Sequence, residues 1–313
     1  MNEYPLVSLI VISYNQQKYI QDCMTSLLEL TYPNIELLYL DDCSPDGSYE
    51  QACRYLDDLR KKYTDVRFIG NETNHGLVNN LNRLVAVSKG KYVKFIAADD
   101  FLTENSIALL VDFMESHAEC DLLYTNGIYG DDSIHFPLQQ TDSLTKLYHG
   151  AQPEGRGLFE NLYAEDFIAA PTVMVRRDVY DKCGMYDNQI GIEDWDFYLR
   201  IAEHGCIGYL DEVTVMYRFT DNSLSHSASP ARRINMQKSN LLIREKYKDK
   251  VTDSQTLIDK GYNDAYQDAV HIGNAEYMKF LHDYADRNHV RISWKNRIRY
   301  LLYRLHVFKI LAH

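Results

Sequence analysis

The feature that most constrains this chain is the alternation of short apolar runs and amphipathic stretches over its first hundred residues. Four runs rich in β-branched and aromatic residues predict buried strands, at 6–13, 35–40, 66–69 and 92–97. Between them, apolar residues at helical spacing predict helices at 17–30, 49–63 and 77–88. Strands separated by helices form right-handed crossover units, so we expect an α/β fold with a mostly parallel sheet flanked by helices.

The rest of the chain divides into a mixed part and a helical part. Residues 101–228 show strand patterns near 121–125, 170–176 and 213–219, and helical patterns near 106–116 and 195–203. From residue 230 onward the pattern is helical, with no strong strand signal. We therefore predict one α/β domain over 1–228 and a C-terminal helical extension over 229–313.

Composition excludes several classes of protein. The net charge is −12, and because residues 287–313 hold seven Lys and Arg and no Asp or Glu, the remaining residues carry −19. General nucleic-acid binding needs a basic surface, which this acidic body lacks. The six Cys form no Cys-x-x-Cys pair, which argues against a zinc ribbon and for a reducing cytoplasm. The start shows no signal-peptide pattern, and no apolar run has the length of a membrane span, so we expect a cytoplasmic protein.

Acidic pairs follow two of the predicted strands. Asp41-Asp42 and Asp99-Asp100 stand where the carboxyl ends of parallel strands meet, which is where ligands bind on such sheets. Carboxylates there accept hydrogen bonds from a ligand or hold a divalent cation. The alternative is capping of the next helix, and for either pair alone the two interpretations stand equally. Asp57-Asp58 falls in a predicted helix and Asp131-Asp132 in a predicted loop.

Seven sequence segments, in the order in which they occur, point to a single protein family. In this order and spacing, over about residues 5–228, they resemble the family 2 glycosyltransferases, whose members adopt the GT-A fold. The segments are PLVSLIVISYNQQKYI, NIELLYLDDCSPDGS, NHGLVNNLN, GKYVKFIAADDFL, APTVMVRRDVYDKCGMYD, GIEDWDFYLRIAEHG and EVTVMYRF.

The resemblance implies a UDP-sugar donor bound by residues 1–100 and an acceptor bound by residues 101–228. Ser13 and Tyr14 would line the nucleotide site, with Tyr14 stacked on uracil. Asp42 would accept the uracil N3–H, and Asp99 would contact the ribose or the sugar. Asp100 would hold Mn²⁺ or Mg²⁺, which stabilises the departing UDP; both ions suit carboxylate and phosphate oxygens.

The same resemblance makes Glu193-Asp194 the catalytic pair. Asp194 would act as general base on the acceptor hydroxyl, which attacks the anomeric carbon from the face opposite UDP and inverts its configuration. Asp166 is a second candidate for the base. It is less favoured because Glu165-Asp166 lacks the preceding Gly-Met-Tyr-Asp segment and the following Trp-Asp and helix.

Two positions depart from the family pattern. The acidic motif is often Asp-x-Asp-Asp, and its first position here is Ala97. Many members carry Tyr-Arg-x-His, whereas Tyr217-Arg218 is followed here by Phe219-Thr220, and the next histidine is His226. His226 is either a displaced metal ligand or an exposed loop residue.

The C-terminal segment 291–312 has the pattern of an amphipathic helix. Trp294, Ile298, Leu301, Leu305 and Phe308 recur at three- and four-residue steps, and cations occupy most of the opposite face. This pattern is typical of a helix lying on an anionic membrane surface, which would place the enzyme peripherally on the inner face of the plasma membrane. The alternative is a helix that packs on the domain or on another subunit of a homo-oligomer.

The function implied is an inverting, metal-dependent UDP-sugar glycosyltransferase of cell-surface polysaccharide assembly, such as capsule, acting on a saccharide or lipid-linked saccharide. A polyprenyl phosphate acceptor is an alternative within this class. A sugar nucleotidyltransferase is a rival, but it would need a Gly-rich basic loop after the first strand, and SYNQQKYI has one Lys and no Gly. A non-catalytic sugar-nucleotide-binding module is a third interpretation, which Ala97 and Phe219 favour and intact Asp100 and Asp194 oppose.

Overall fold

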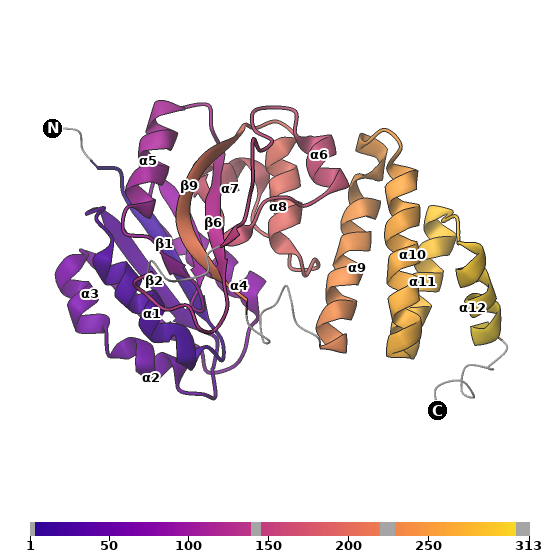
Figure 1. Cartoon of the computed structure of the whole chain (residues 1–313), viewed down its shortest axis with the longest axis horizontal. Coiled ribbons are helices and arrows are strands. Elements are labelled where there is room, and N and C mark those ends of the chain that lie inside the picture. Colours follow the sequence, from indigo (N-terminus) through magenta and orange to yellow (C-terminus); the bar gives the residue numbers. More distant parts are fainter. Residues whose placement is uncertain (1–3, 139–144, 220–228, 305–313) are drawn as a thin grey trace. The chain divides into compact units, whose positions relative to one another are not determined.

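The computed structural model describes residues 4–138, 145–219 and 229–304. It contains all four strands predicted for the first hundred residues, and Figure 1 labels two of them, β1 and β2. The four strands pair in parallel in the order β3-β2-β1-β4. Every residue of β1 and β2 is buried, because helices cover both faces of the sheet. The strands are β1 (Val7–Ser13), β2 (Ile35–Asp41), β3 (Asp65–Gly70) and β4 (Tyr92–Ala97).

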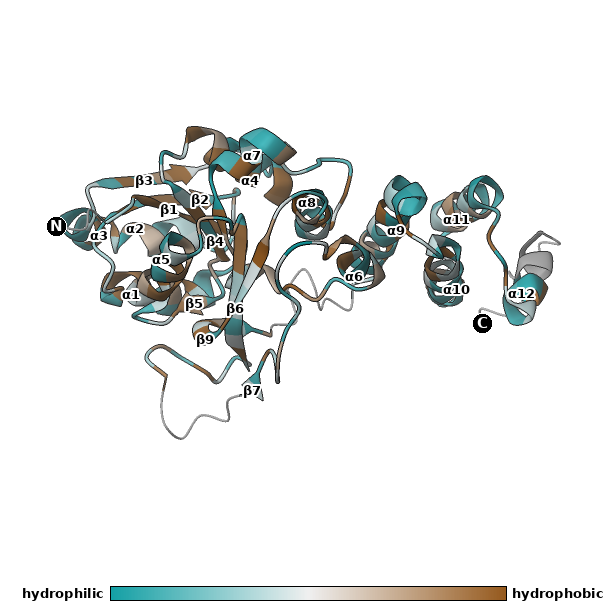
Figure 2. Ribbon diagram, turned by 90° about the horizontal axis from the view of Figure 1, so that it is seen from above, coloured by the Kyte–Doolittle hydropathy of each residue, from teal (hydrophilic) through white to brown (hydrophobic). Residues whose placement is uncertain are grey.

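Helices lie on both faces of this sheet. Figure 2 shows α1 (Gln17–Glu29) and α5 (Ser106–Ser116) on one side and α4 (Leu77–Val87) and α7 (Asp178–Cys183) on the other. The apolar faces of α1 and α5 pack against strand residues in the main hydrophobic core.

The strand register brings the candidate site residues to one edge of the sheet. Ser13 of β1 pairs with Asp41 of β2, and Ile12 pairs with Ala97 of β4. The chain therefore leaves all three strands at nearly the same level, and the loops that follow them gather there.

One predicted helix is wrong in its extent. The stretch 49–63 forms two short helices, α2 (Ser48–Cys53) and α3 (Leu56–Lys62), rather than one. The backbone N–H groups of Arg54 and Tyr55 bond three residues back, to Gln51 and Ala52, which tightens the chain and ends α2. Asp57 and Asp58 lie in the first turn of α3, where carboxylates favour a helix start.

The later strands make the sheet mixed, so the expectation of a mostly parallel sheet holds only for its first part. β8 (Met174–Arg176) lies antiparallel between β4 and β6 (Leu122–Gly130), and β9 (Ile207–Arg218) runs parallel to β6. β5 (Phe101–Leu102) and β7 (Thr145–Lys146) add short antiparallel edges. The predicted strand 170–176 begins instead with a 3₁₀ turn, Ala170–Thr172.

A second compact unit contains residues 189–192 and the described C-terminal helices. Its core is rich in tyrosine, with Tyr262, Tyr266, Tyr277 and Tyr284 among its buried side chains. Within the described ranges, no helix combines the length and apolar character that a membrane crossing requires. The helices are α9 (Pro230–Tyr247), α10 (Ser254–Ile272), α11 (Ala275–Asn288) and α12 (Trp294–Arg304).

Candidate active site

Asp42, which follows β2, is held by N–H donors of the protein itself. Its carboxylate accepts hydrogen bonds from the Asn71 side chain (2.9 Å) and from the backbone N–H groups of His75 and Gly76 (both 2.8 Å). Burial alone would raise the pKa of Asp42, but these donors outweigh it and hold the pKa below its usual value. Gly76 directly precedes α4, so Asp42 satisfies backbone groups at the start of that helix.

Ser13 and Tyr14 at the end of β1 differ in their exposure. The Ser13 side chain is 1% exposed; it bonds the Tyr39 hydroxyl (2.7 Å) and donates to the Asp41 carboxylate (2.7 Å). Ser13 therefore joins two strand ends in the structure, and its role in nucleotide binding stays a prediction. Tyr14 is 43% exposed, which suits the predicted stacking on a base.

Asp99 and Asp100 lie in the tight turn between β4 and β5. They are 8% and 1% exposed. Burial raises the pKa of both carboxyl groups, and the negative charge of Asp99 raises that of Asp100 further. One Asp100 oxygen accepts the backbone N–H of Arg218 (2.8 Å), and the other is buried without a hydrogen-bond partner.

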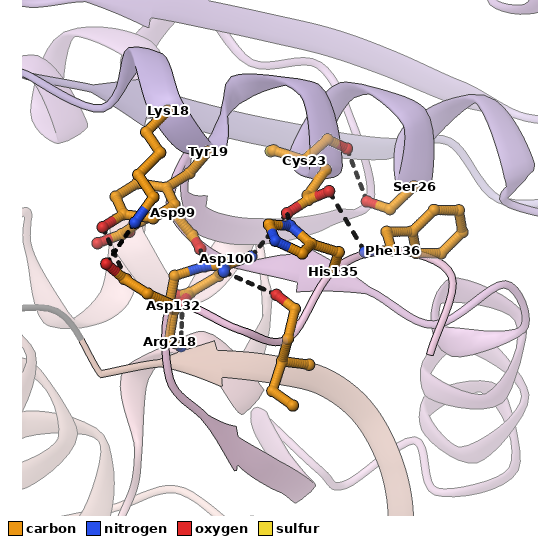
Figure 3. Close-up of polar contacts among 12 residues, drawn as sticks. Lys18, Tyr19, Cys23, Ser26, Asp99, Asp100, Asp132, His135, Phe136 and Arg218 are labelled. Carbon is orange, nitrogen blue, oxygen red and sulfur yellow. Dashed lines mark hydrogen bonds and ion pairs between the residues drawn. The ribbon is translucent and has the colours of Figure 1, made fainter. Parts of the chain in front are cut away.

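Arg218 is the residue of this site that the sequence analysis missed. It ends β9, its side chain is fully buried, and it lies directly beside the acidic pair (Figure 3). A lone Arg that closes the apolar run VTVMYR was the available signal, because a charge on a buried strand must find partners.

Glu193 and Asp194 begin α8 (Glu193–Ala202) and line a pocket on the sheet. Burial raises the pKa of Asp194. Burial and the negative charge of Asp194 raise the pKa of Glu193 to about 8. A carboxylate with a raised pKa is a stronger base near neutral pH, which suits general base catalysis. The pocket also includes Val93 and Phe95 of β4, Ala170, Val173, Val175, Tyr180, Tyr186, Tyr198 and Leu81.

Asp166, the second candidate for the base, interacts electrostatically with Glu193 and Asp194. It follows α6 (Phe159–Ala164), and the residue is exposed to solvent. The protein packed around it and the negative charges of Asp194 and Glu193 raise the pKa of its carboxyl well above the usual value. The structure thus brings both candidates for the base into one electrostatic cluster, and the choice of Asp194 stays a prediction.

Asp99 and Asp100 are the carboxylates available to a divalent cation at the end of β4. Across the described ranges, no group of three or more His, Cys, Asp and Glu side chains is arranged to hold a metal. Ala97 supplies no ligand, and His226 lies outside the described residues. The unpartnered Asp100 oxygen fits a cation site, because a buried carboxylate oxygen is costly until something binds it.

Two sequence comparisons agree with one another. The profile of glycosyl transferase family 2 matches residues 8–184, which is more than half of the chain. TuaG of Bacillus subtilis, named for teichuronic acid biosynthesis, is 27% identical over 231 residues, covering 72% of this chain and 83% of TuaG.

Solved structures share the fold. The Staphylococcus aureus TarS fragment 1–349 in complex with UDP-GlcNAc has a TM-score of 0.64 at 17% identity, covering 90% of this chain and 80% of the fragment. The mannosyltransferase PcManGT from Pyrobaculum calidifontis, in complex with GDP-Man and Mn²⁺, has a TM-score of 0.60 at 14% identity and covers 99% and 86%. At these identities the likeness concerns the fold, a mixed sheet with flanking helices of the GT-A type.

Proposed function

The chain belongs to glycosyl transferase family 2 and is a glycosyltransferase, and on that premise we propose that it moves a sugar from a UDP-sugar to a hydroxyl acceptor with inversion at the anomeric carbon. One observation carries the proposal. Phe95 of β4 lines the pocket that contains Glu193 and Asp194, and the same strand runs on to Asp99-Asp100. One strand therefore connects a candidate base with a candidate donor-binding motif.

On the acceptor side, Asp194 takes the proton of the attacking hydroxyl as its oxygen bonds to the anomeric carbon. The bond from that carbon to the UDP oxygen breaks on the opposite face, and its electron pair leaves with UDP. Glu193, with its pKa raised to about 8, holds a proton near neutral pH. Because Glu193 is then the protonated member of the pair, we assign the role of base to Asp194.

On the donor side, Tyr14 offers its exposed ring to the uracil, and Asp42 offers a carboxylate that the loop 71–76 already holds in place. Asp99 would contact the ribose or the sugar, and Asp100 would hold the divalent cation. When bound, Mn²⁺ or Mg²⁺ would supply Lewis-acid stabilisation of the departing diphosphate. Structural neighbours in complex with UDP-GlcNAc and with GDP-Man and Mn²⁺ support a nucleotide-sugar donor. The choice of uracil rests on Asp42 and Tyr14.

The setting we propose is the assembly of a cell-surface polysaccharide, with a saccharide or lipid-linked saccharide as acceptor. The support is the similarity to TuaG, whose name places it in teichuronic acid biosynthesis.

The test is UDP release from UDP-glucose, UDP-galactose and their N-acetylated forms, with and without Mn²⁺, in the wild type and in Asp194→Asn. Loss of the base is expected to slow release by about 10²- to 10⁴-fold, with UDP affinity unchanged. Asp166→Asn is the matched control and is expected to keep most of the activity. Release by Asp194→Asn within about tenfold of wild type would sink this assignment, and no release from any UDP-sugar would sink the donor class.

The C-terminal helix α12 adds a membrane contact to this proposal. Trp294 and Ile298 are 68% and 50% exposed, and their four-residue spacing puts them on one face of the helix. Together with the six Lys and Arg of 291–309, this apolar face matches an anionic lipid surface, where apolar burial and charge attraction act together.

Co-sedimentation of the full-length protein with phosphatidylglycerol vesicles tests this contact. We expect binding at low salt that weakens as salt rises, since exposed charges are screened. The double variant Trp294→Ser/Ile298→Ser is expected to lose it, and Val87→Ser, which changes an exposed apolar residue elsewhere, to keep it. Two results would favour the subunit contact instead: no binding of the wild type to these vesicles at low salt, or a change of oligomeric state in the double variant.

A further inference from the structure

Arg218 connects four separate segments through a single buried side chain (Figure 3). Its guanidinium donates hydrogen bonds to backbone oxygens on two of them and to a carboxylate on α1, and it lies over an aromatic ring of the same helix. The partners are the Asp99 carbonyl (2.8 Å), the Ile134 carbonyl (2.7 Å), the Asp22 carboxylate (2.9 Å) and the Tyr19 ring (4.8 Å to its centre).

The same residue fixes both members of the acidic motif. The Arg218 guanidinium holds the backbone of Asp99, and the Arg218 backbone N–H donates to the Asp100 carboxylate (2.8 Å). Neither contact uses up the Asp99 carboxylate or the second Asp100 oxygen. Arg218 therefore sets the position of the motif without occupying the oxygen atoms that a ligand would use.

The charge of Arg218 is balanced elsewhere. In the described part of the chain, its guanidinium forms an ion pair with Asp22 and with no other carboxylate. A buried guanidinium without a counter-ion would be drawn to other carboxylates close enough to feel its charge, among them those of Asp99 and Asp100. Because Arg218 pairs with Asp22, it forms no ion pair with either carboxylate of the motif in the described residues.

Asp22 is itself held by the segment that follows β6. Its carboxylate also accepts hydrogen bonds from His135 Nδ1 (2.9 Å) and from the Phe136 backbone N–H (3.3 Å). In the same segment, Asp132 bonds Lys18 and the Tyr19 hydroxyl of α1 (Figure 3). The segment 131–136 therefore contacts Asp22 directly and α1 at two further residues.

We propose that Arg218 is the positioning residue of the Asp99-Asp100 motif and that Asp22 is the counter-ion that keeps its guanidinium away from the motif carboxylates. The proposal rests on the proposed function in taking this motif as the site of a divalent cation and a nucleoside diphosphate. Asp22 acts through Arg218 and touches neither ligand.

Asp22→Asn tests the proposal in the full-length protein. It removes one charge and leaves the size of the side chain unchanged. Mn²⁺ affinity is measured by electron paramagnetic resonance at saturating UDP, and UDP affinity is measured separately by calorimetry in EDTA. Glu36→Gln is the matched control, because Glu36 is an equally buried carboxylate paired with an arginine, Arg67 (3.0 Å), at the opposite edge of the sheet.

We expect Asp22→Asn to weaken Mn²⁺ binding by at least about tenfold, because the unpaired guanidinium repels the cation and competes for its ligands. UDP affinity in EDTA should stay the same or increase, since the same guanidinium attracts the diphosphate. Asp22→Glu keeps the charge and should restore Mn²⁺ affinity, and Glu36→Gln should leave both affinities unchanged. General loosening of the site predicts instead that both affinities fall together.

Arg218→Lys is the second variant if Asp22→Asn does not fold. It keeps the charge near Asp22 but cannot bond the Asp99 and Ile134 carbonyls together, so Mn²⁺ affinity should still fall by several-fold. Folded variants that bind Mn²⁺ within about twofold of wild type, or that lose Mn²⁺ and UDP equally, overturn the inference. The wild type alone tests the premise taken from the proposed function: a wild type that binds no UDP with Mn²⁺ overturns that premise, whereas a failure confined to the variants overturns only this inference.

Discussion

The two Asp-Asp pairs, at the end of β2 and just after β4, are identical in sequence and opposite in surroundings. Asp42 receives three N–H donors, and its pKa is held below the usual value. Asp100 receives one donor, its second oxygen has no partner, and its pKa is raised well above the usual value. The difference comes from the loops, because residues 71–76 present amide groups to Asp42, whereas β4 turns directly into β5 at Asp100.

A buried carboxylate can stabilise the protein or bind a ligand. A carboxylate that the protein supplies with donors stabilises the loop that supplies them, whether or not a ligand also uses it. A carboxylate left without donors lowers stability, which points to a ligand that completes its surroundings. The two pairs should therefore respond to substitution with opposite signs.

The largest effect is expected at the satisfied pair. Asp42→Ala leaves three N–H groups without an acceptor and should lower the free energy of unfolding by about 2 to 4 kcal/mol. Urea denaturation followed by circular dichroism measures it. A loss below about 0.5 kcal/mol would mean that the loop 71–76 does not depend on Asp42, and the proposed difference between Asp42 and Asp100 would be wrong.

The effect of opposite sign is expected at the unsatisfied pair. Asp100→Asn keeps an oxygen for the Arg218 N–H and replaces a carboxyl whose ionisation is disfavoured by burial and by Asp99, so the free energy of unfolding at neutral pH in EDTA should rise by about 2 kcal/mol. The gain in UDP affinity on adding Mn²⁺ should disappear in the same variant. Asp100→Asn destabilised as much as Asp42→Ala would show that the two pairs serve the same structural role.

Glu193 is a third carboxyl group of the site, and its raised pKa makes the stability of the protein depend on pH. Its pKa is about 8 in the folded protein and near 4.5 when exposed, so its protonated form adds stability at low pH that is lost as pH rises from about 4.5 to 8. Glu193→Gln cannot ionise and avoids this loss. A shift of this size corresponds to at most about 3.5 kcal/mol between pH 5 and pH 8. Because Glu193 is partly exposed to solvent, we expect the variant to gain about 1 to 2 kcal/mol of unfolding free energy relative to wild type over this range. A pH-independent difference between the two proteins would contradict the raised pKa.

Local patterns predicted the parallel part of the fold, and tertiary contacts decided the rest. The apolar runs that became β1, β2 and β4 end within a residue of their predicted ends, since a strand covered on both faces must be apolar throughout. The antiparallel pairing of β8 could not be predicted, because a three-residue strand carries no sign of its partner. Lys94 interrupts an apolar strand and is buried nonetheless, because it donates to the Pro171 and Val173 carbonyls.

For the candidate site, the amino-acid sequence predicts which side chains stand at the ends of strands and which family they resemble. Their surroundings follow from the folded structure: N–H donors reach Asp42, Asp166 shares the electrostatic field of Glu193 and Asp194, and Arg218 lies between Asp22 and the acidic motif. The position of a residue at a strand end follows from local hydrophobic pattern, whereas its charge environment depends on segments up to 196 residues away in the chain, as between Asp22 and Arg218.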